Sequence, residues 1–318
     1  MGINGDGKLW DCIVVGGGPA GLTAAIYAAR ANLSTLVFEK AMTGGLVSLT
    51  DEIENYPGFV EVMHGPDLMK RFEEQAKRMG AEFEFAEIQS IADAPEVHPV
   101  AKKITDWMGN EYFAKTVVVA TGSQPNRLPA ARAEEFFGRG VSYCATCDAN
   151  FFVDKHCIVV GGGDAALEEG FYLTGFCSKI TLVHRRQGFR ATPRAVEKAR
   201  KHPKFEFVLD TVIEEILGEN SVVGAKCRNL QTGNEFVINC DGVFVFIGHT
   251  PVTDWVKGYL TLNDKGEIPV DHRMRTNKPG VYAAGDVVED AEKQAVVSAG
   301  MGCIAAITAR QFLEDLNE

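Results

Sequence analysis

Apolar residues along this chain fall into short β-branched runs, and the first of these runs is followed at once by glycines. Residues 11–15 predict a buried parallel strand, because the run is short, apolar and β-branched. A glycine cluster occupies 16–21, the alanine-rich segment 22–31 predicts a helix, and 34–38 predict a second strand. This order of elements predicts a βαβ unit.

The pattern returns about 145 residues further on, at a spacing that indicates two related domains rather than a solenoid repeat. Residues 156–160 predict a strand, 161–166 a glycine turn, 167–174 a helix and 179–183 a second strand. A basic helix is expected at 193–204. The chain therefore contains two predicted βαβ units of the same kind.

Two further predicted strands end in a glycine, polar residues and a proline. They lie at 116–120, before Thr121–Pro125, and at 242–247, before Gly248–Pro251. Such segments are typical of crossing points between domains. After the second one, 280–286 predict a strand with a tight turn, and 294–316 a terminal helix.

These elements predict an α/β fold with two Rossmann-like dinucleotide-binding domains, the second inserted into the first. The first domain is expected to be discontinuous, with residues 1–125 and 252–318, and the second to span 126–251. A length of 318 residues agrees with two domains, because it exceeds what one hydrophobic core usually organises.

Composition and charge limit the partners and the cellular compartment that we expect for this protein. The net charge of −11 argues against nucleic acid or an anionic membrane as the main partner. No uninterrupted apolar stretch approaches the length of a membrane span, and residues 1–8 lack the apolar core of a signal peptide. Eight scattered cysteines then predict a protein of the reducing cytoplasm.

The first glycine cluster matches a dinucleotide-binding fingerprint at Gly16, Gly18 and Gly21. A lone pattern of this kind is weak evidence, but here a strand precedes it, a helix follows it, and Glu39 ends the next strand. The glycines allow close approach to a pyrophosphate at the positive end of the helix, and Glu39 can accept hydrogen bonds from ribose hydroxyls. An ordinary tight turn is the less favoured alternative.

The second cluster has the permitted variant Gly161, Gly163 and Ala166. Its next strand is followed by four basic residues: His184, Arg185, Arg186 and Arg190. Arginines attract the 2′-phosphate of NADP, which an acidic residue would repel, and each charge-assisted hydrogen bond contributes about 1.5–3 kcal/mol. A solvated basic face is the alternative. One acidic and one basic ribose position predict FAD in the first domain and NADPH in the second, with hydride passing from nicotinamide to flavin.

Cys144 and Cys147 are separated by two residues, so a single turn brings their thiols within disulfide range. A zinc site would need a second ligand pair at zinc spacing, which the sequence lacks. A pair of buried spectator thiols is disfavoured because the flanking residues are polar. A redox dithiol beside a flavin is the favoured hypothesis, with Asp148 placed to exchange the proton.

The other six cysteines stand alone, mostly in apolar segments. We expect them to be buried thiols that pack as small hydrophobic residues. They are Cys12, Cys157, Cys177, Cys227, Cys240 and Cys303.

Taken together and in this order, the segments 16–21, 54–58, 120–122, 144–148, 184–190 and 284–286 resemble the low-molecular-weight thioredoxin reductases over nearly the whole chain. The resemblance implies homodimers, FAD, and a cysteine pair carried on the NADPH domain. It implies that Cys147 lies nearer the flavin, that Cys144 attacks the disulfide of thioredoxin, and that Asp148 is the acid/base.

The resemblance also implies cofactor contacts beyond the two fingerprints. Asp286 and the pair Gln294 and Ala295 would hold the ribityl chain and ring of the flavin, and Asn55 would lie near it. Further residues expected at the FAD are Pro19, Ala20, Gly45, Leu46, Ala120, Thr121, Gly122 and Gly285, and at the NADPH Asp164 and Ala165.

The cysteines and the nicotinamide site both belong to the inserted domain, yet both must reach one flavin ring. The family solves this by rotating the inserted domain, and we place the hinges at Gly122–Pro125 and Gly248–Pro251.

Two departures from the family pattern bear on reactivity and on the electron donor. Leu46 stands where glutamine is usual, and Glu292-Lys293 where an aromatic-Arg pair is frequent. The alternatives are a related disulfide reductase or a dithiol oxidase on the same scaffold, and a redox-sensing flavoprotein without turnover. The arginines disfavour the oxidase, and the cysteine pair beside the NADPH cluster disfavours the sensor.

Overall fold

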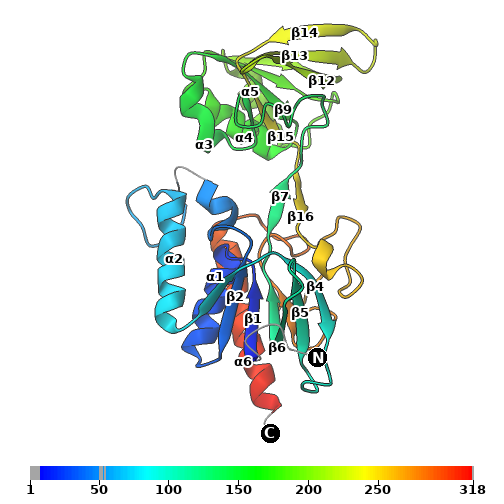
Figure 1. The fold of residues 1–318 in the computed structure, drawn as a ribbon. Coiled ribbons are helices and arrows are strands. Elements are labelled where there is room, and N and C mark those ends of the chain that lie inside the picture. The colour runs from blue at the N-terminus through cyan, green and yellow to red at the C-terminus, as the bar shows by residue number, and fades with distance from the viewer. Residues whose placement is uncertain (1–7, 50–52, 54, 317–318) are drawn as a thin grey trace. The chain divides into compact units, whose positions relative to one another are not determined.

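The protein is described by a computed structural model that covers residues 8–49, 53 and 55–316, without the side chains of Leu49, Thr146 and Cys147. The chain divides into two compact units (Figure 1). Unit 1 contains Met1–Gln124 and Thr250–Glu318, and unit 2 contains Pro125–His249. The chain crosses between them in β7 (Ser123–Pro125) and β16 (His249–Pro251), which pair in a two-stranded sheet.

Unit 1 is built on a seven-stranded sheet with the order β3-β2-β1-β6-β5-β4, in which β17 also pairs with β6. Strands β1, β2, β3, β6 and β17 are parallel, whereas β4, β5 and β6 form an antiparallel meander. The strands span Leu9–Val15 (β1), Thr35–Glu39 (β2), Glu82–Phe85 (β3), Ile88–Asp93 (β4), Lys102–Asp106 (β5), Glu111–Val119 (β6) and Val281–Ala283 (β17).

The helices of unit 1 are α1 (Pro19–Arg30), α2 (Gly65–Met79) and α6 (Ala295–Asp315), with the short turns η1 (Gly45–Leu49) and η3 (Asp254–Val256). Helices α1 and α6 pack closely because their facing residues are alanine and glycine. A side chain at Gly302 would lie 2.0 Å from the carbonyl oxygen of Ala20. Among the described helices, α6 alone is long and apolar enough to cross a membrane, but one face of it is buried in this core.

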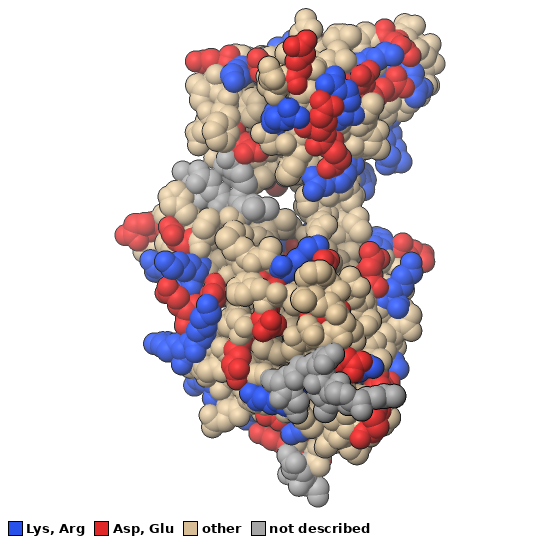
Figure 2. Space-filling model, in the orientation of Figure 1, with Lys and Arg blue, Asp and Glu red and all other residues tan. Residues whose placement is uncertain are grey.

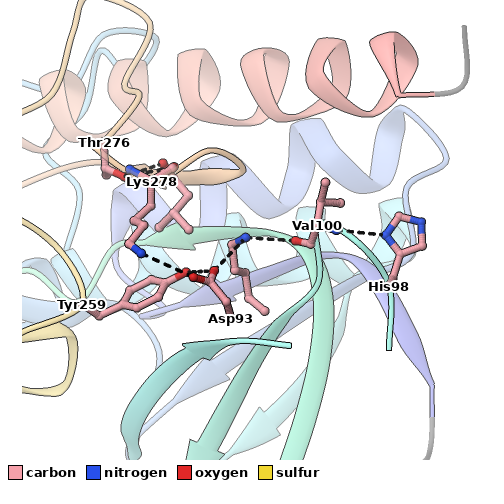
Figure 3. A network of polar contacts seen from close by, with 8 residues as sticks. Asp93, His98, Val100, Tyr259, Thr276 and Lys278 are labelled. Carbon is pink, nitrogen blue, oxygen red and sulfur yellow. Dashed lines mark hydrogen bonds and ion pairs between the residues drawn. The ribbon is translucent and has the colours of Figure 1, made fainter. Parts of the chain in front are cut away.

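A polar network joins the β4–β5 hairpin to the C-terminal part of unit 1 (Figure 3). Asp93 at the end of β4 accepts a hydrogen bond from the Tyr259 hydroxyl at 2.7 Å and pairs with Lys278 at 3.4 Å. The buried Lys102 lies 3.2 Å from the same carboxylate and donates to the carbonyl of Val100 at 3.0 Å. These contacts hold the chain returning from unit 2 against the sheet.

Unit 2 has a five-stranded parallel sheet with the order β11-β10-β9-β15-β8, and a separate antiparallel sheet with the order β12-β13-β14. The parallel strands are β8 (Val141–Ser142), β9 (His156–Gly161), β10 (Lys179–Val183), β11 (Phe205–Val208) and β15 (Gly242–Phe246). The others are β12 (Thr211–Gly218), β13 (Val222–Asn229) and β14 (Glu235–Asn239), and the helices are α3 (Ala145–Asp148), η2 (Ala149–Phe152), α4 (Asp164–Leu173) and α5 (Pro193–Lys201). The expected α/β class with two Rossmann-like units is confirmed.

The structure corrects three helix boundaries. Helix α1 begins at Pro19 rather than at 22, and α4 at Asp164 rather than at 167, because extended N-cap glycines let each helix start inside its glycine turn. Helix α5 ends at Lys201 rather than at 204. His202 there is extended, as a residue that precedes proline usually is.

Acidic and basic side chains are interspersed over the face of the molecule seen in Figure 2. Of the six cysteines expected to be buried, five are buried, but Cys303 is partly exposed on α6. It lies beside Tyr27 of α1.

Candidate functional site

The first glycine turn lies between β1 and α1, at the carboxyl ends of the parallel strands of unit 1. Gly16 has φ +111°, and a side chain on it would meet the carbonyl oxygen of Ala120 at 2.2 Å. A side chain at Gly21 would lie 1.8 Å from the carbonyl oxygen of Gly16, so only glycine fits. Gly18 caps α1 without a side-chain hydrogen bond. The first N–H groups of α1 therefore lack a side-chain acceptor at the cap, which suits an anion.

Glu39 ends β2 beside this turn. Its carboxylate accepts hydrogen bonds from the N–H groups of Gly17 at 2.8 Å, Lys40 at 2.7 Å and Ala41 at 3.3 Å. A carboxylate has about four acceptor positions, so an acceptor position remains for a ribose hydroxyl. The buried Thr43, which sequence reasoning missed, donates to the carboxylate of Glu73 on α2 and holds the following loop. No local sequence signal marks that contact.

The remaining residues expected at the flavin are also all in unit 1, and several are in contact. Asp286, which follows β17, accepts hydrogen bonds from Ser123 and Ser298, each at 3.3 Å. The side-chain amide of Asn55 donates to Gln294 at 3.2 Å, across 239 positions of sequence. Gly45 and Leu46 lie in η1, Ala120, Thr121 and Gly122 follow β6, and Ala295 opens α6. A side chain at Gly285 would lie 2.9 Å from Ala20, which brings the end of β17 to the start of α1.

The second glycine turn lies between β9 and α4 in unit 2. Gly161 has φ +153°, and a side chain on it would meet the carbonyl oxygen of Phe246 at 2.3 Å and the methyl group of Ala166 at 2.6 Å. Alanine is accommodated at the third fingerprint position because the first is glycine. Gly163 is the extended N-cap of α4, and Ala165 follows in its first turn.

The basic residues lie in the loop after β10, and this loop is joined to the glycine turn. The N–H groups of Arg190 and Ala191 donate to the carbonyl of Gly162 at 2.8 and 3.2 Å. The side chain of Asp164 accepts from the N–H of Thr192 at 2.8 Å. Within the part of the chain that the structure describes, the guanidinium groups of Arg185, Arg186 and Arg190 have no ion-pair or hydrogen-bond partner.

His184 begins this loop and packs directly on the glycine turn. A side chain at Gly162 would lie 2.2 Å from Cε1 of the imidazole. The ring stacks on Phe189 with centroids 5.2 Å apart, and Nε2 lies 3.1 Å from the carbonyl of Gly188. Burial lowers the pKa of His184, and the three neighbouring arginines lower it further. These surroundings therefore favour the neutral form of the imidazole.

Two residues behind the basic loop were not found from the sequence. The buried Asp210, between β11 and β12, accepts a hydrogen bond from the side chain of Gln187. The N–H of the adjacent Thr211 donates to the carbonyl of His184 at 3.0 Å. The loop is thus fixed from both sides, although nothing in the local sequence pairs positions 187 and 210.

The redox segment follows β8. Cys144 is disulfide-bonded, and the other cysteines described with their side chains are free. The side chain of Cys147 lies outside what the structure describes, and its backbone lies in α3. Ser142 is buried despite the polarity expected of this segment. Its hydroxyl oxygen accepts from the N–H of Cys144 at 3.1 Å and donates to the Cys144 carbonyl at 3.0 Å.

A cavity of about 310 Å³ opens beside this segment within unit 2. Its lining includes Ser142, Asp148, Phe151, Arg139 and Lys155. The carboxylate next to the second redox cysteine therefore lines the same cavity as basic and aromatic side chains.

Comparison with known proteins identifies the family to which this chain belongs. The model of the pyridine nucleotide-disulphide oxidoreductases matches residues 10–302, and the chain belongs to this family. A thioredoxin reductase of Listeria monocytogenes is 42% identical over 315 residues, which cover 98% of this chain and 96% of the relative. One from Streptomyces coelicolor is 44% identical over 308 residues, which cover 96% and 94%.

The solved structures that this chain resembles are thioredoxin reductases as well. Thioredoxin reductases of Lactococcus lactis and T. acidophilum match with TM-scores of 0.84 and 0.81, at 36% and 32% identity. Each match covers 96% of this chain and 99% of the solved one. Within its family the chain is thus one of the low-molecular-weight thioredoxin reductases, as the sequence motifs implied. Its family pairs a flavin with a nicotinamide nucleotide.

Proposed function

We propose that the chain is an NADPH-dependent thioredoxin-disulfide reductase in which electrons pass from NADPH through FAD to a Cys144–Cys147 disulfide. One observation carries the proposal: the unit that holds the disulfide-bonded Cys144 also holds three arginines without a partner among the described residues, in a loop whose backbone is bonded to a glycine turn. A nucleotide-binding fold and a redox disulfide in one unit are what such a reductase requires.

FAD fits unit 1, since the glycine turn leaves room for a pyrophosphate and the Glu39 carboxylate lies beside it. Asp286, Asn55 and Gln294 would hold the remainder of the cofactor. When bound, the flavin supplies a two-electron carrier between the nicotinamide and the disulfide. The protein's own contribution is to position and shield that carrier.

NADPH fits unit 2. The 2′-phosphate would lie among Arg185, Arg186 and Arg190, which form no ion pair with any described residue although the net charge of the chain is −11. Because Gly162, Asp164 and Asp210 hold the loop in place, little ordering is lost on binding. This supports a marked preference for NADPH over NADH.

In the reduced enzyme, the thiolate of Cys144 attacks one sulfur of the thioredoxin disulfide and forms a mixed disulfide. Cys147 then attacks the Cys144 sulfur and releases reduced thioredoxin. Asp148 lies one residue from Cys147 and exchanges the proton that these steps require. Phe151, which is 71% exposed beside the cavity, supports thioredoxin as the partner of this surface.

A homodimer is supported by the outer face of α1 and α6, where Tyr27, Val296, Ile304 and Ile307 are exposed. Exposed apolar side chains on packed helices favour burial against a second copy. The free state of the six remaining cysteines fits the reducing cytoplasm. The two connecting strands β7 and β16 are proposed as the hinges for rotation of unit 2.

Anaerobic titration of the yellow protein with NADPH, and separately with NADH, followed by oxidised thioredoxin, tests this function. We expect NADPH to bleach the flavin and thioredoxin to restore its absorbance. Cys144→Ser is the matched variant, which should bleach but not recover. Bleaching without recovery in the wild type would point to another disulfide partner. Absence of bleaching by either nucleotide would contradict the NADPH site and favour an oxidase or another donor.

A further inference from the structure

Two cysteines outside the redox segment are in direct contact. The sulfur atoms of Cys157 and Cys177 lie 3.5 Å apart, and both residues are fully buried in unit 2. Cys157 lies in β9, and Cys177 lies in the turn between α4 and β10. The sequence separates them by 20 positions and gives no sign of this contact.

Backbone hydrogen bonds fix the two cysteines relative to each other. The N–H of Cys177 donates to the carbonyl of Leu173 at the end of α4 at 2.8 Å. The N–H of Ser178 donates to Lys155, just before β9, at 2.9 Å. A disulfide bond is about 2.0 Å long, so closing it would draw the sulfurs about 1.5 Å closer, within reach of small side-chain rotations.

The surroundings of the pair favour a thiolate at Cys177. The ammonium group of Lys204 donates to the carbonyls of Thr174 and Cys177 at 2.6 and 2.8 Å. The hydrogen bond shared with Cys157 lowers the pKa of Cys177, burial opposes this, and the charge of Lys204 lowers the pKa further, so that the net shift is downward. For Cys12, Cys227 and Cys240 burial dominates and raises the pKa values to about 12, 11 and 12. Only the thiolate is nucleophilic, so Cys177 differs from these buried thiols.

We propose that Cys157 and Cys177 are a second redox dithiol, which a hydroperoxide oxidises to a buried disulfide. The Cys177 thiolate attacks the terminal oxygen of the hydroperoxide, the O–O bond breaks, and an alcohol (water, from hydrogen peroxide) leaves with a proton. The Cys157 sulfur then attacks the sulfenic acid, the S–S bond forms, and water leaves with the thiol proton. Two thiols are oxidised by two electrons, and one hydroperoxide is reduced.

Access to the pair is through the turn that carries Cys177. Gly175 and Ser178 on either side of it are exposed, and the turn joins α4 to β10 at the surface. Local opening of such a turn requires far less than global unfolding. Hydrogen peroxide, which is little larger than water, then reaches the sulfur.

The bond would close a loop that contains the glycine turn Gly161–Gly163 and all of α4. A cross-link of this length restricts the unfolded chain and stabilises the folded unit. The cysteines lie at the end of α4 opposite the nucleotide turn, so we expect nucleotide binding to persist. The oxidised protein should therefore resist heat, with a KM for NADPH within twofold of that of the reduced protein.

Mass spectrometry tests the proposal. The full-length holoenzyme is reduced, freed of reductant, treated with hydrogen peroxide, denatured in N-ethylmaleimide and digested. We expect a peptide pair linked through Cys157 and Cys177, in addition to the linked 144–147 peptide, which serves as the internal positive control. Full alkylation of Cys157 and Cys177 in protein whose 144–147 disulfide has formed would overturn the proposal.

Thermal denaturation gives a second readout. The melting temperature of the peroxide-treated wild type should exceed that of the same protein after dithiothreitol by roughly 5–10 °C. Cys177→Ala should keep only the part of this difference that the 144–147 disulfide contributes, and Cys240→Ala, which removes another buried thiol, should retain all of it. An equal shift in Cys177→Ala and wild type would also overturn the proposal. The linked peptide is measured in the wild type, so the test does not depend on the folding of either variant.

Discussion

The hydroxyl of Ser123 lies 3.3 Å from the carboxylate of Asp286. Ser123 is the first residue of β7, where the chain leaves unit 1, and Asp286 is a residue proposed to hold the flavin. The same carboxylate also accepts from Ser298 of α6 at 3.3 Å. One carboxylate therefore links the start of the proposed hinge to the proposed flavin site within unit 1.

Proline at position 123 should restrict the hinge. Ser123→Pro is expected to slow turnover by about tenfold, equivalent to about 1.4 kcal/mol, because it fixes φ in β7. FAD binding should persist. Stopped-flow kinetics with NADPH and thioredoxin measure the effect, and Ser123→Ala controls for loss of the hydroxyl. Equal turnover in Ser123→Pro and Ser123→Ala would rule out a hinge at β7.

A methyl group at position 162 should disturb the basic loop. Gly162→Ala places Cβ where the His184 ring now lies, and relief of that overlap costs about 1–3 kcal/mol. We expect the KM for NADPH to rise by about 10- to 100-fold while the flavin spectrum stays normal. Gly188→Ala is the control, because a side chain there meets no atom within 4 Å. A similar KM in the two variants would contradict the packing role of His184.

The arginines should set the choice of nucleotide. Arg186→Ser removes charge-assisted hydrogen bonds worth about 1.5–3 kcal/mol and should raise the KM for NADPH by about 10- to 100-fold. The KM for NADH should stay within twofold. Arg194→Ser, on α5, is the control. Inhibition by adenosine 2′,5′-bisphosphate relative to AMP isolates the phosphate contact, and an unchanged ratio in Arg186→Ser would refute it.

Unit 2 should lose stability as the solution becomes acidic. Burial lowers the pKa values of His156 and His184 below the ordinary value of 6.5, so the folded state favours their neutral forms. Below about pH 6.5 the unfolded chain binds more protons than the folded one. The free energy of unfolding therefore decreases as the pH is lowered. The melting temperature of unit 2 should fall between pH 7.5 and 5.5 in the wild type and change less in His156→Gln/His184→Gln. Parallel curves would exclude the two histidines as the cause.

The network around Asp93 should stabilise unit 1. Asp93→Asn leaves the ammonium groups of Lys102 and Lys278 without their carboxylate, and Lys102 is only 6% exposed. Because Asp93 is half-exposed, we expect a loss of about 1–2 kcal/mol in unfolding free energy, measured by urea denaturation. Glu87→Gln breaks the exposed pair with Lys40 and should change stability by under about 0.5 kcal/mol. Equal losses in the two variants would contradict this role of Asp93.

Much of the fold could be predicted because its signals are local. Buried parallel strands appear in the sequence as β-branched runs. The glycine turns can be predicted as well, because only glycine fits where two backbone segments lie in close contact, as Gly16 and Ala120 do. The β4–β5 hairpin and the sheet β12–β14 were not predicted from the sequence. Their strands are partly exposed, so their patterns lack the continuous apolar runs that mark buried parallel strands.

The candidate site could be predicted only where chemistry follows a fixed spacing. The fingerprint glycines, Glu39, the arginines and the cysteine pair have such spacing. Contacts such as Asp210 with Gln187, or Cys157 with Cys177, join positions about 20 residues apart. No repeat or spacing rule connects them, because tertiary packing alone brings them together.

The insertion of unit 2 has a consequence for synthesis on the ribosome. Unit 2 is one continuous segment, whereas unit 1 needs β17 and α6, which are translated last. Until then the alanine-rich face of α1 lacks its covering helix. The nascent chain thus carries a complete unit 2 while unit 1 is still unfinished, and in that interval the apolar face of α1 stays uncovered.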